Sequence, residues 1–301
     1  MNQASGRRSS GRIQRIGGSF CLLRGDLQFL SLPTTGVEQV CEHDSMSVRE
    51  VGGTWVMDLD GVVWLAELPI PGSAEAVARL RVAGIRVLFV TNNAAPTVAE
   101  LLERLAIAGI VAQEEDLITS AQAAASMLEP GSTAVVCADE GVTEALARRG
   151  VQVVPEGPAD AVVVSWTRNF DFDRLATAAL AVRAGARFIA TNEDATHPTP
   201  ERLLPGAGAI LAAVATAAQA TPEVAGKPHG PLVSLLRERA ADISMVVGDR
   251  PSTDGLLARR LEVPFALVRT GVTRDGREPI VVDPDEDAAD LAGLVERILE
   301  L

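Results

Sequence analysis

The sequence predicts an α/β protein with a doubly wound parallel-sheet core into which a smaller α/β domain is inserted. From Thr54 onward, short apolar runs alternate with helical patterns, which is typical of β-α units in a parallel sheet. A second series of such units lies between the breakers Pro130-Gly131 and Thr221-Pro222, and it is long enough for a small domain. The 301 residues, 47% of them hydrophobic, can supply one or two cores.

The core is expected to combine short apolar strands with helices. One helix opens near Pro71, because proline suits the first helical turn, and another near Pro231. Thr97 and Glu100 have the spacing of a capping box at a further helix start. The predicted strands are Thr54 to Met57, Arg86 to Val90, Ser244 to Val247 and Pro264 to Val268.

The inserted domain repeats this pattern. Its predicted strands are Ala134 to Ala138, Val151 to Val154, Ala161 to Trp166 and Arg187 to Thr191, with helices at Thr143 to Arg149 and Asp173 to Arg183. We assign residues 46–130 and 222–301 to the core and 131–221 to the inserted domain. Residues 1–45 have no sustained periodicity and are expected to be disordered, and Met46 is an alternative start.

Charge and composition argue against several classes of partner. A net charge of -13 disfavours nucleic acid, because proteins that bind it rely on clustered Lys and Arg. Cys21, Cys41 and Cys137 have no Cys-x-x-Cys spacing, which indicates free thiols in a reducing compartment. No apolar run approaches the ~20 residues of a membrane span. The sequence therefore predicts a cytoplasmic protein with no nucleic-acid and no membrane partner.

The most informative segment is an apolar strand that ends in Asp58, Asp60 and Gly61. The carboxyl ends of parallel strands face the ligand crevice, so Asp58 should lie at its floor. Two acids two residues apart can divide the work, since one can coordinate a hard cation and attack phosphorus while the other exchanges a proton with the leaving group. An EF-hand is excluded because Val62 and Pro69 occupy ligand positions. A plain turn after the strand stays an alternative.

The next predicted strand is followed by Thr91, Asn92 and Asn93. A threonine hydroxyl can donate to a phosphoryl oxygen, and the two amides can orient a substrate. The same residues also suit a loop or a helix cap. Their value comes from the sheet edge that they share with the acidic segment.

Two more acids, Asp249 and Asp254, follow the strand that ends at Val247. Their oxygens could complete a ligand shell for Mg2+ together with Asp58. Capping of the following helix by Ser252 or Thr253 is compatible with this interpretation.

Lys227 is the only lysine in the sequence. It is not a P-loop lysine, because Thr221 and Pro228 stand where that motif needs glycine and a hydroxyl residue. A compact ammonium that neutralises an attacking carboxylate and phosphoryl oxygens is the better interpretation. Chance survival of one lysine is the alternative.

Taken in order, these four segments resemble the motifs of the haloacid dehalogenase superfamily of phosphohydrolases. The inserted domain is similar to the cap of the class IIA branch, which includes p-nitrophenylphosphatase-like, phosphoglycolate and glycerol-phosphate phosphatases. The resemblance covers about residues 50–275. It implies a Rossmann-like core, Mg2+ as cofactor, a small phosphorylated metabolite as substrate and a homodimer formed through the cap.

The resemblance also implies a role for each matching residue. Asp58 would be nucleophile and Mg2+ ligand, and Asp60 would be general acid, then base, with its backbone carbonyl on Mg2+. The remaining assignments are Thr91, Asn92 and Asn93 for phosphoryl and substrate binding, Lys227 for charge balance, Asp249 for Mg2+, and Asp254 just outside the inner ligand sphere.

Two residues depart from the family pattern. Gly255 stands where an aliphatic residue is expected, and Ser252 where an acid is common, so either could loosen the metal site. Asp60 favours a phosphatase over a dehalogenase, because an alkoxide leaving group needs an acid. A phosphomutase or phosphotransferase, or a catalytically impaired protein of the same fold that binds a phosphorylated ligand, is the alternative.

Substrate choice is expected to lie in the cap. Asp194 and His197 belong to a polar run after a predicted strand and are the candidates for substrate contact. A locally bonded loop histidine is the alternative for His197. Gly206 and Gly208 lack the third glycine of a dinucleotide loop, and they are expected to begin a helix.

Overall fold

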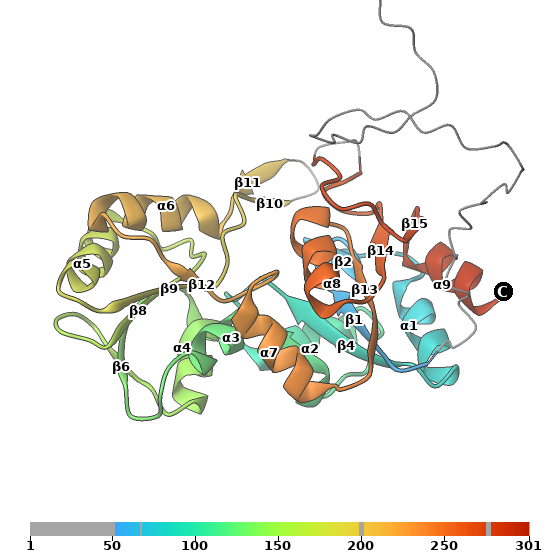
Figure 1. The fold of residues 1–301 in the computed structure, drawn as a ribbon, viewed down its shortest axis with the longest axis horizontal. Coiled ribbons are helices and arrows are strands. Elements are labelled where there is room, and N and C mark those ends of the chain that lie inside the picture. The colour runs from blue at the N-terminus through green and yellow to red at the C-terminus, as the bar shows by residue number, and fades with distance from the viewer. Residues whose placement is uncertain (1–51, 67, 199–201, 275–277, 301) are drawn as a thin grey trace, which may run out of the picture. The chain divides into compact units, whose positions relative to one another are not determined.

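The computed structural model describes residues 52–66, 68–198, 202–274 and 278–300 (Figure 1). Every described residue belongs to one compact unit, which lies within Met46–Leu301. The expected disorder of residues 1–45 and the alternative start at Met46 lie outside the described residues.

The first sheet has six parallel strands in the order β15-β14-β13-β1-β4-β5. Its strands are β1 (Thr54–Asp58), β4 (Arg86–Thr91), β5 (Leu117–Thr119), β13 (Ile243–Gly248), β14 (Phe265–Val268) and β15 (Glu286–Ala288). The predicted core strands are confirmed with small shifts at their ends. The short edge strands β5 and β15 have no counterpart in the prediction.

Helices cover both faces of this sheet, as its strands require. Alternate residues of β1 enter different apolar clusters, because successive side chains of a strand point to opposite faces. Met57 belongs to the cluster with Leu80 of α1 (Ser73–Val82) and Leu294 of α9 (Leu291–Leu299), whereas Val56 belongs to the cluster with Leu232 of α7 (Gly230–Arg239). The doubly wound arrangement of the core is therefore confirmed.

The second sheet has five parallel strands in the order β12-β9-β8-β6-β7. Its strands are β6 (Thr133–Cys137), β7 (Gln152–Val154), β8 (Ala161–Val164), β9 (Arg187–Ala190) and β12 (Glu223–Val224). One face packs against α5 and α6 through residues such as Val182 and Val214. The sheet extends through β12 to Val224, three residues beyond the predicted edge at 221, and the domain edges at 131 and 221 stay predictions.

Two helices begin where the sequence predicts a helix start. Thr97 accepts a hydrogen bond from the backbone N–H of Glu100, and the Glu100 side chain bonds back to Thr97, which confirms the capping box. Gly206 is the N-cap of α6, so the expected helix start there is also confirmed. The helices are α1 (Ser73–Val82), α2 (Val98–Ile107), α3 (Ser120–Ser126), α4 (Glu140–Arg148), α5 (Phe172–Arg183), α6 (Ala207–Ala218), α7 (Gly230–Arg239), α8 (Leu256–Leu261) and α9 (Leu291–Leu299).

Shorter elements complete the fold. Two antiparallel hairpins pair β2 (Trp64–Leu65) with β3 (Leu68–Pro69) and β10 (Thr196–Pro198) with β11 (Leu203–Pro205). A 3-10 turn spans Glu114–Asp116, and a π-helical turn spans Pro251–Gly255. Within the described residues, no helix is both long enough and apolar enough to cross a membrane.

Candidate active site

A cavity of about 1250 Å³ is lined by chain that follows the strands of both sheets. From the first sheet it receives Asp58, Thr91 and Asp249, which lie at or just beyond the ends of β1, β4 and β13. From the second it receives Trp166 and Asn192, which follow β8 and β9. Because the strands within each sheet are parallel, their carboxyl ends bring these separated segments together.

Lys227 joins two carboxylates below this cavity. Its Nζ lies 2.7 Å from Asp58 Oδ1 and 2.7 Å from Asp254 Oδ1. The second Asp254 oxygen accepts a hydrogen bond from the backbone N–H of Arg250 at 3.1 Å. All three side chains of the Asp58-Lys227-Asp254 group are buried, so their charges are little screened by water.

Asp249 is held by hydrogen bonds from two residues that follow β14. Its Oδ2 accepts a hydrogen bond from the Val272 N–H at 2.6 Å, and its carbonyl accepts one from the Thr273 hydroxyl at 3.0 Å. A Cβ on Gly61 would lie 2.5 Å from Asp249 Cγ, and one on Gly271 would lie 1.8 Å from Asp249 Oδ2. Both glycines therefore make room for this carboxylate.

The electrostatics of the cluster reflect an excess of negative charge. Burial raises the pKa of Asp58 well above its ordinary value, although the Lys227 ammonium acts in the opposite direction. Burial, and next the Asp254 carboxylate, raise the pKa of Asp249 to about 7. Burial opposes the charge of Lys227, but Asp254 and Asp58 outweigh it, so the pKa of Lys227 is raised. Three buried carboxylates thus share one buried ammonium.

This donor set fits a hard divalent cation. One carboxylate oxygen from each of Asp58, Asp249 and Asp254 can be chosen so that all lie within 4.8 Å of one another. Mg2+ prefers oxygen ligands and is commonly held by a few carboxylates with water completing the shell. A divalent cation would also balance the surplus negative charge.

Asp60 lies apart from this cluster, on the wall of the cavity. Its Oδ1 accepts a hydrogen bond from Trp64 Nε1 at 3.1 Å, which anchors the side chain. Burial raises the pKa of Asp60, while His197, the bond from Trp64 and the more distant Lys227 lower it. His197 therefore lies near enough to Asp60 to affect its charge.

Asn92 links the second motif to Lys227. Its Oδ1 accepts a hydrogen bond from the Lys227 backbone N–H at 2.8 Å, and its Nδ2 donates to the Lys227 carbonyl at 3.2 Å. The Asn92 carbonyl accepts bonds from Ser120 and Asn192, each at 2.7 Å. Gly226 permits this approach, since a Cβ there would lie 2.5 Å from Asn92 Oδ1. Asn92 thus holds the segment that carries the lysine.

Thr91 and Asn93 are organised by the turn that follows β4. The Thr91 hydroxyl accepts a hydrogen bond from the Asn93 backbone N–H at 2.9 Å, so its own proton is still available to donate. Asn93 Oδ1 accepts a bond from the Ala95 N–H at 3.2 Å. Both residues line the cavity.

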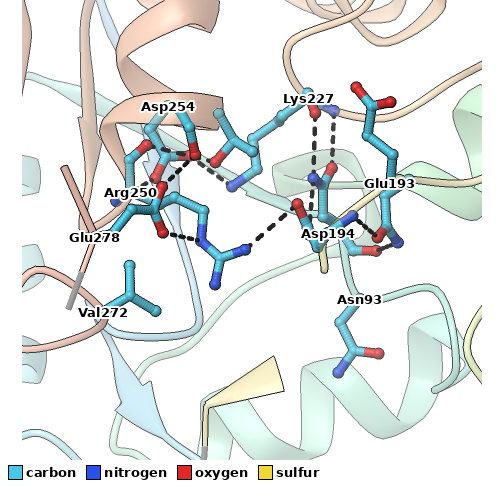
Figure 2. Close-up of polar contacts among 12 residues, drawn as sticks. Asn93, Glu193, Asp194, Lys227, Arg250, Asp254, Val272 and Glu278 are labelled. Carbon is cyan, nitrogen blue, oxygen red and sulfur yellow. Dashed lines mark hydrogen bonds and ion pairs between the residues drawn. The ribbon is translucent and has the colours of Figure 1, made fainter. Parts of the chain in front are cut away.

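Asp194 is engaged with two residues of the core fold. Figure 2 shows it beside Arg250, whose Nη1 lies 3.4 Å from Asp194 Oδ1. Asn92 Nδ2 donates to Asp194 Oδ2 at 3.1 Å. On its other side, Arg250 pairs with Glu278 through Nε at 3.3 Å. The contacts of Asp194 indicate a role in holding the segment after β9 against the site.

The structure collects the predicted residues at one place. Those that line the cavity are Asp58, Asp60, Thr91, Asn92, Asn93, Asp194, His197, Lys227 and Asp249. Asp254 reaches the site through Lys227. The prediction missed Arg250 and Trp166, which also line it. Arg250 directly follows Asp249, a predicted metal ligand, and this position is the sequence feature that could have indicated its place in the site.

The two departures from the family pattern have local explanations. A Cβ on Gly255 would lie 3.0 Å from the Val282 Cβ and 3.2 Å from a ring carbon of Phe265, so a side chain there would require these neighbours to move by a few tenths of an ångström. The Ser252 hydroxyl donates to the Glu278 carboxylate, which also pairs with Arg250. Although Ser252 and Gly255 differ from the family pattern, the neighbouring Asp254 contacts Lys227.

Gly248→Ala should destabilise the fold because the new methyl group would overlap Asp254. A Cβ there would lie 2.2 Å from Asp254 Cγ, and overpacking of this kind costs about 1–3 kcal/mol. Gly230→Ala is the matched control, since its Cβ meets nothing within 4 Å. Urea unfolding should show a loss of stability for the first variant alone, and equal stabilities would contradict the close packing.

Comparison with known proteins follows the same segments. Residues 55–152 match a family described as haloacid dehalogenase-like hydrolase, and residues 224–294 match a related HAD-hydrolase-like family. D-glycerol 3-phosphate phosphatase of Mycobacterium tuberculosis is 38% identical over 77% of this chain, which spans 64% of that relative's length. Acid sugar phosphatase of Staphylococcus saprophyticus is 32% identical, with 81% of this chain and 97% of the relative covered.

A solved structure gives the same result in three dimensions. The glycerol phosphate phosphatase of Mycobacterium tuberculosis in complex with magnesium superposes with a TM-score of 0.74 at 36% identity. The match covers 82% of this chain and 77% of that one. Together with the four motifs gathered at one sheet edge, these similarities place the chain in a family: it belongs to the haloacid dehalogenase-like hydrolases, in their class IIA branch.

Proposed function

We propose that this chain is a Mg2+-dependent phosphatase that hydrolyses a small phosphate monoester through a phosphorylated Asp58. The observation that carries the proposal is the position of Asp58, whose carboxylate contacts buried Lys227 at the floor of the cavity, close to Asp249. The names of the relatives, which are phosphatases of small metabolites, support it.

We assign the cation site to Asp58, Asp249 and the backbone carbonyl of Asp60. Asp254 would stay outside the inner ligand sphere, because its two oxygens already accept hydrogen bonds from Lys227 and Arg250. When bound, Mg2+ would offset the charge of the phosphoryl oxygens and so let an anionic nucleophile approach an anionic substrate.

In the first half of the reaction, an Asp58 oxygen attacks phosphorus and the bond to the ester oxygen breaks. Asp60 donates its proton to that leaving oxygen, for which the raised pKa of this half-buried carboxyl is suited. Lys227 holds Asp58 in place and neutralises charge on the transferring group. The products of this step are an alcohol and phosphorylated Asp58.

In the second half, Asp60 takes a proton from a water molecule whose oxygen attacks phosphorus. The Asp58–phosphorus bond breaks, and inorganic phosphate leaves with Asp58 restored. The Thr91 hydroxyl donates to a phosphoryl oxygen in both halves, and Asn93 helps to orient the ester. Asn92 acts through Lys227, whose backbone it holds on both sides.

The other expectations from the sequence enter the proposal unchanged. The substrate is a small phosphorylated metabolite, and the cap takes part in its selection through His197, which lies near Asp60. A cytoplasmic location, the lack of nucleic-acid and membrane partners, and a homodimer through the cap stay predictions.

Asp58→Asn should abolish turnover while leaving the fold intact. An amide is a poor nucleophile, and removing the nucleophile of a covalent mechanism should lower kcat by at least about a thousandfold. Release of inorganic phosphate from p-nitrophenyl phosphate measures this, with Mg2+ or with EDTA. EDTA should remove wild-type activity, and added Mg2+ should restore it.

Asp173→Asn, an exposed carboxylate in the first turn of α5, is the control for the charge change and should keep full activity. Activity that survives in Asp58→Asn, or that ignores EDTA, would refute the mechanism. Transfer of label to an acceptor instead of water would favour the phosphomutase or phosphotransferase alternative.

Asp194→Ala should lower kcat/KM about tenfold, the amount expected for loss of one charge-assisted hydrogen bond. The reason is that Asn92 and Arg250 share this carboxylate as an acceptor. The neighbouring Glu193→Ala is the control, because Glu193 is exposed and contacts His229 instead. If both variants behave alike in p-nitrophenyl phosphate turnover, Asp194 has no special position.

A further inference from the structure

The wall of the cavity on the side of the second sheet is built from three adjacent strand ends. β6, β8 and β9 are neighbours and run parallel, so the segments that follow them share one edge. These segments supply Asp139, Trp166, Arg168 and Asn192 to the cavity lining. The mechanism proposed above assigns no role to these four side chains. Their charges and shapes decide which leaving group fits against this wall.

Trp166 connects this wall to Asp60. Its ring centroid lies 5.9 Å from that of His197, and His197 and Asp60 line the same cavity. Its Nε1 donates to the Pro205 carbonyl at 3.2 Å, which fixes the ring. Beyond it, Arg168 Cζ lies 5.6 Å from the Trp166 ring centroid. A leaving group protonated by Asp60 can therefore extend past His197 and Trp166 toward Arg168.

Arg168 is arranged to bind an anion. A guanidinium that rests over an aromatic ring is oriented through its face, and the N–H groups at its edge stay free to donate. Those N–H groups match a carboxylate or a phosphate, which can accept two parallel hydrogen bonds. In the described part of the chain, Arg168 forms no ion pair with a carboxylate, in contrast to Arg148 and Arg187 of the same sheet region.

Arg174, which also lines the cavity, supplies a second guanidinium. Its Nη1 donates to the Ala138 carbonyl at 3.3 Å, and its other donors form no carboxylate pair among the described residues. It sits in the first turn of α5, where the helix dipole disfavours a cation. Helix stability therefore does not account for an arginine at this position.

Two acids that line the cavity here, Asp139 and Glu100, already have partners, whereas the exposed Glu140 forms no ion pair among the described residues. The Asp139 carboxylate accepts a hydrogen bond from the Thr167 hydroxyl at 2.5 Å. Glu100, which lines the cavity from α2, accepts the bonds of the capping box. The carboxylates of Asp139 and Glu100 are accordingly less available than the guanidinium groups of Arg168 and Arg174 to contact a ligand that enters the cavity.

We propose that Arg168 and Arg174 form a second anion site, which binds a carboxylate or a second phosphate on the leaving group of the substrate. The inference rests on the proposed phosphatase function and names its substrate class: phosphate monoesters whose alcohol carries a further negative charge. Trp166 and His197 line the path between the two anionic ends.

Two matched pairs of esters test this site. Glycerol 3-phosphate is compared with 3-phosphoglycerate for a carboxylate, and fructose 6-phosphate with fructose 1,6-bisphosphate for a second phosphate. The wild type should show a kcat/KM about tenfold higher for the ester with the additional anionic group, 3-phosphoglycerate or fructose 1,6-bisphosphate, in at least one pair. One charge-assisted contact provides a difference of this size. The pair that shows the preference identifies the anion.

Arg168→Gln and Arg174→Gln should each remove most of this preference. Turnover of the ester without the additional anionic group, glycerol 3-phosphate or fructose 6-phosphate, should stay within about twofold of wild type. Arg183→Gln is the matched control, because it removes an exposed arginine from the other end of α5 and should keep the preference. An equal loss on both members of a pair would overturn the assignment, as would a preference that survives in both variants.

Turnover of p-nitrophenyl phosphate separates the two proposals. If wild type hydrolyses it with Mg2+ but prefers neither charged ester, the anion site is overturned and the phosphatase function stands. If p-nitrophenyl phosphate and all four esters fail, the phosphatase function is overturned and the anion site falls with it.

Discussion

The buried contact of Lys227 with Asp58 and Asp254 is the interaction on which the site depends. Each carboxylate lies 2.7 Å from the ammonium, and Asp249 adds a third buried acid nearby. Removing one partner of a buried ion pair typically costs about 3–5 kcal/mol, because the other charge is left without compensation. The adjacency of β1 and β13 in the sheet, together with the hold of Asn92 on Lys227, brings these charges together.

The sequence was sufficient for the parts of the site that follow from local pattern. Apolar strands that end in Asp58, Thr91 and Gly248 are recognisable, and parallel pairing carries their ends to one edge. The lysine was recognisable because it is unique in the chain. Gly61 and Gly226 stand where a side chain would collide with Asp249 or Asn92, and these close contacts were not predicted.

Pairing between distant segments could not be predicted in the same way. Asp194 lines the cavity and its contact with substrate stays a prediction, but its bonds to Asn92 and Arg250 could not be foreseen, because no periodicity encodes that meeting. The close approach of Val282 and Phe265 to Gly255 is likewise a contact between distant segments that the local sequence does not indicate. The short strands β5 and β15 were missed because runs of three residues carry too little pattern, and tertiary contacts decide their conformation.

The most direct test of the account is to trap the phosphorylated enzyme. Wild-type protein is mixed with Mg2+ and p-nitrophenyl phosphate, quenched in acid during turnover, digested and analysed by mass spectrometry. The account predicts one added phosphoryl group on the peptide that contains Asp58, removed by borohydride with conversion of Asp58 to homoserine. A phosphoryl group on a serine, threonine or histidine, or active protein that is never phosphorylated, would contradict a mechanism centred on Asp58.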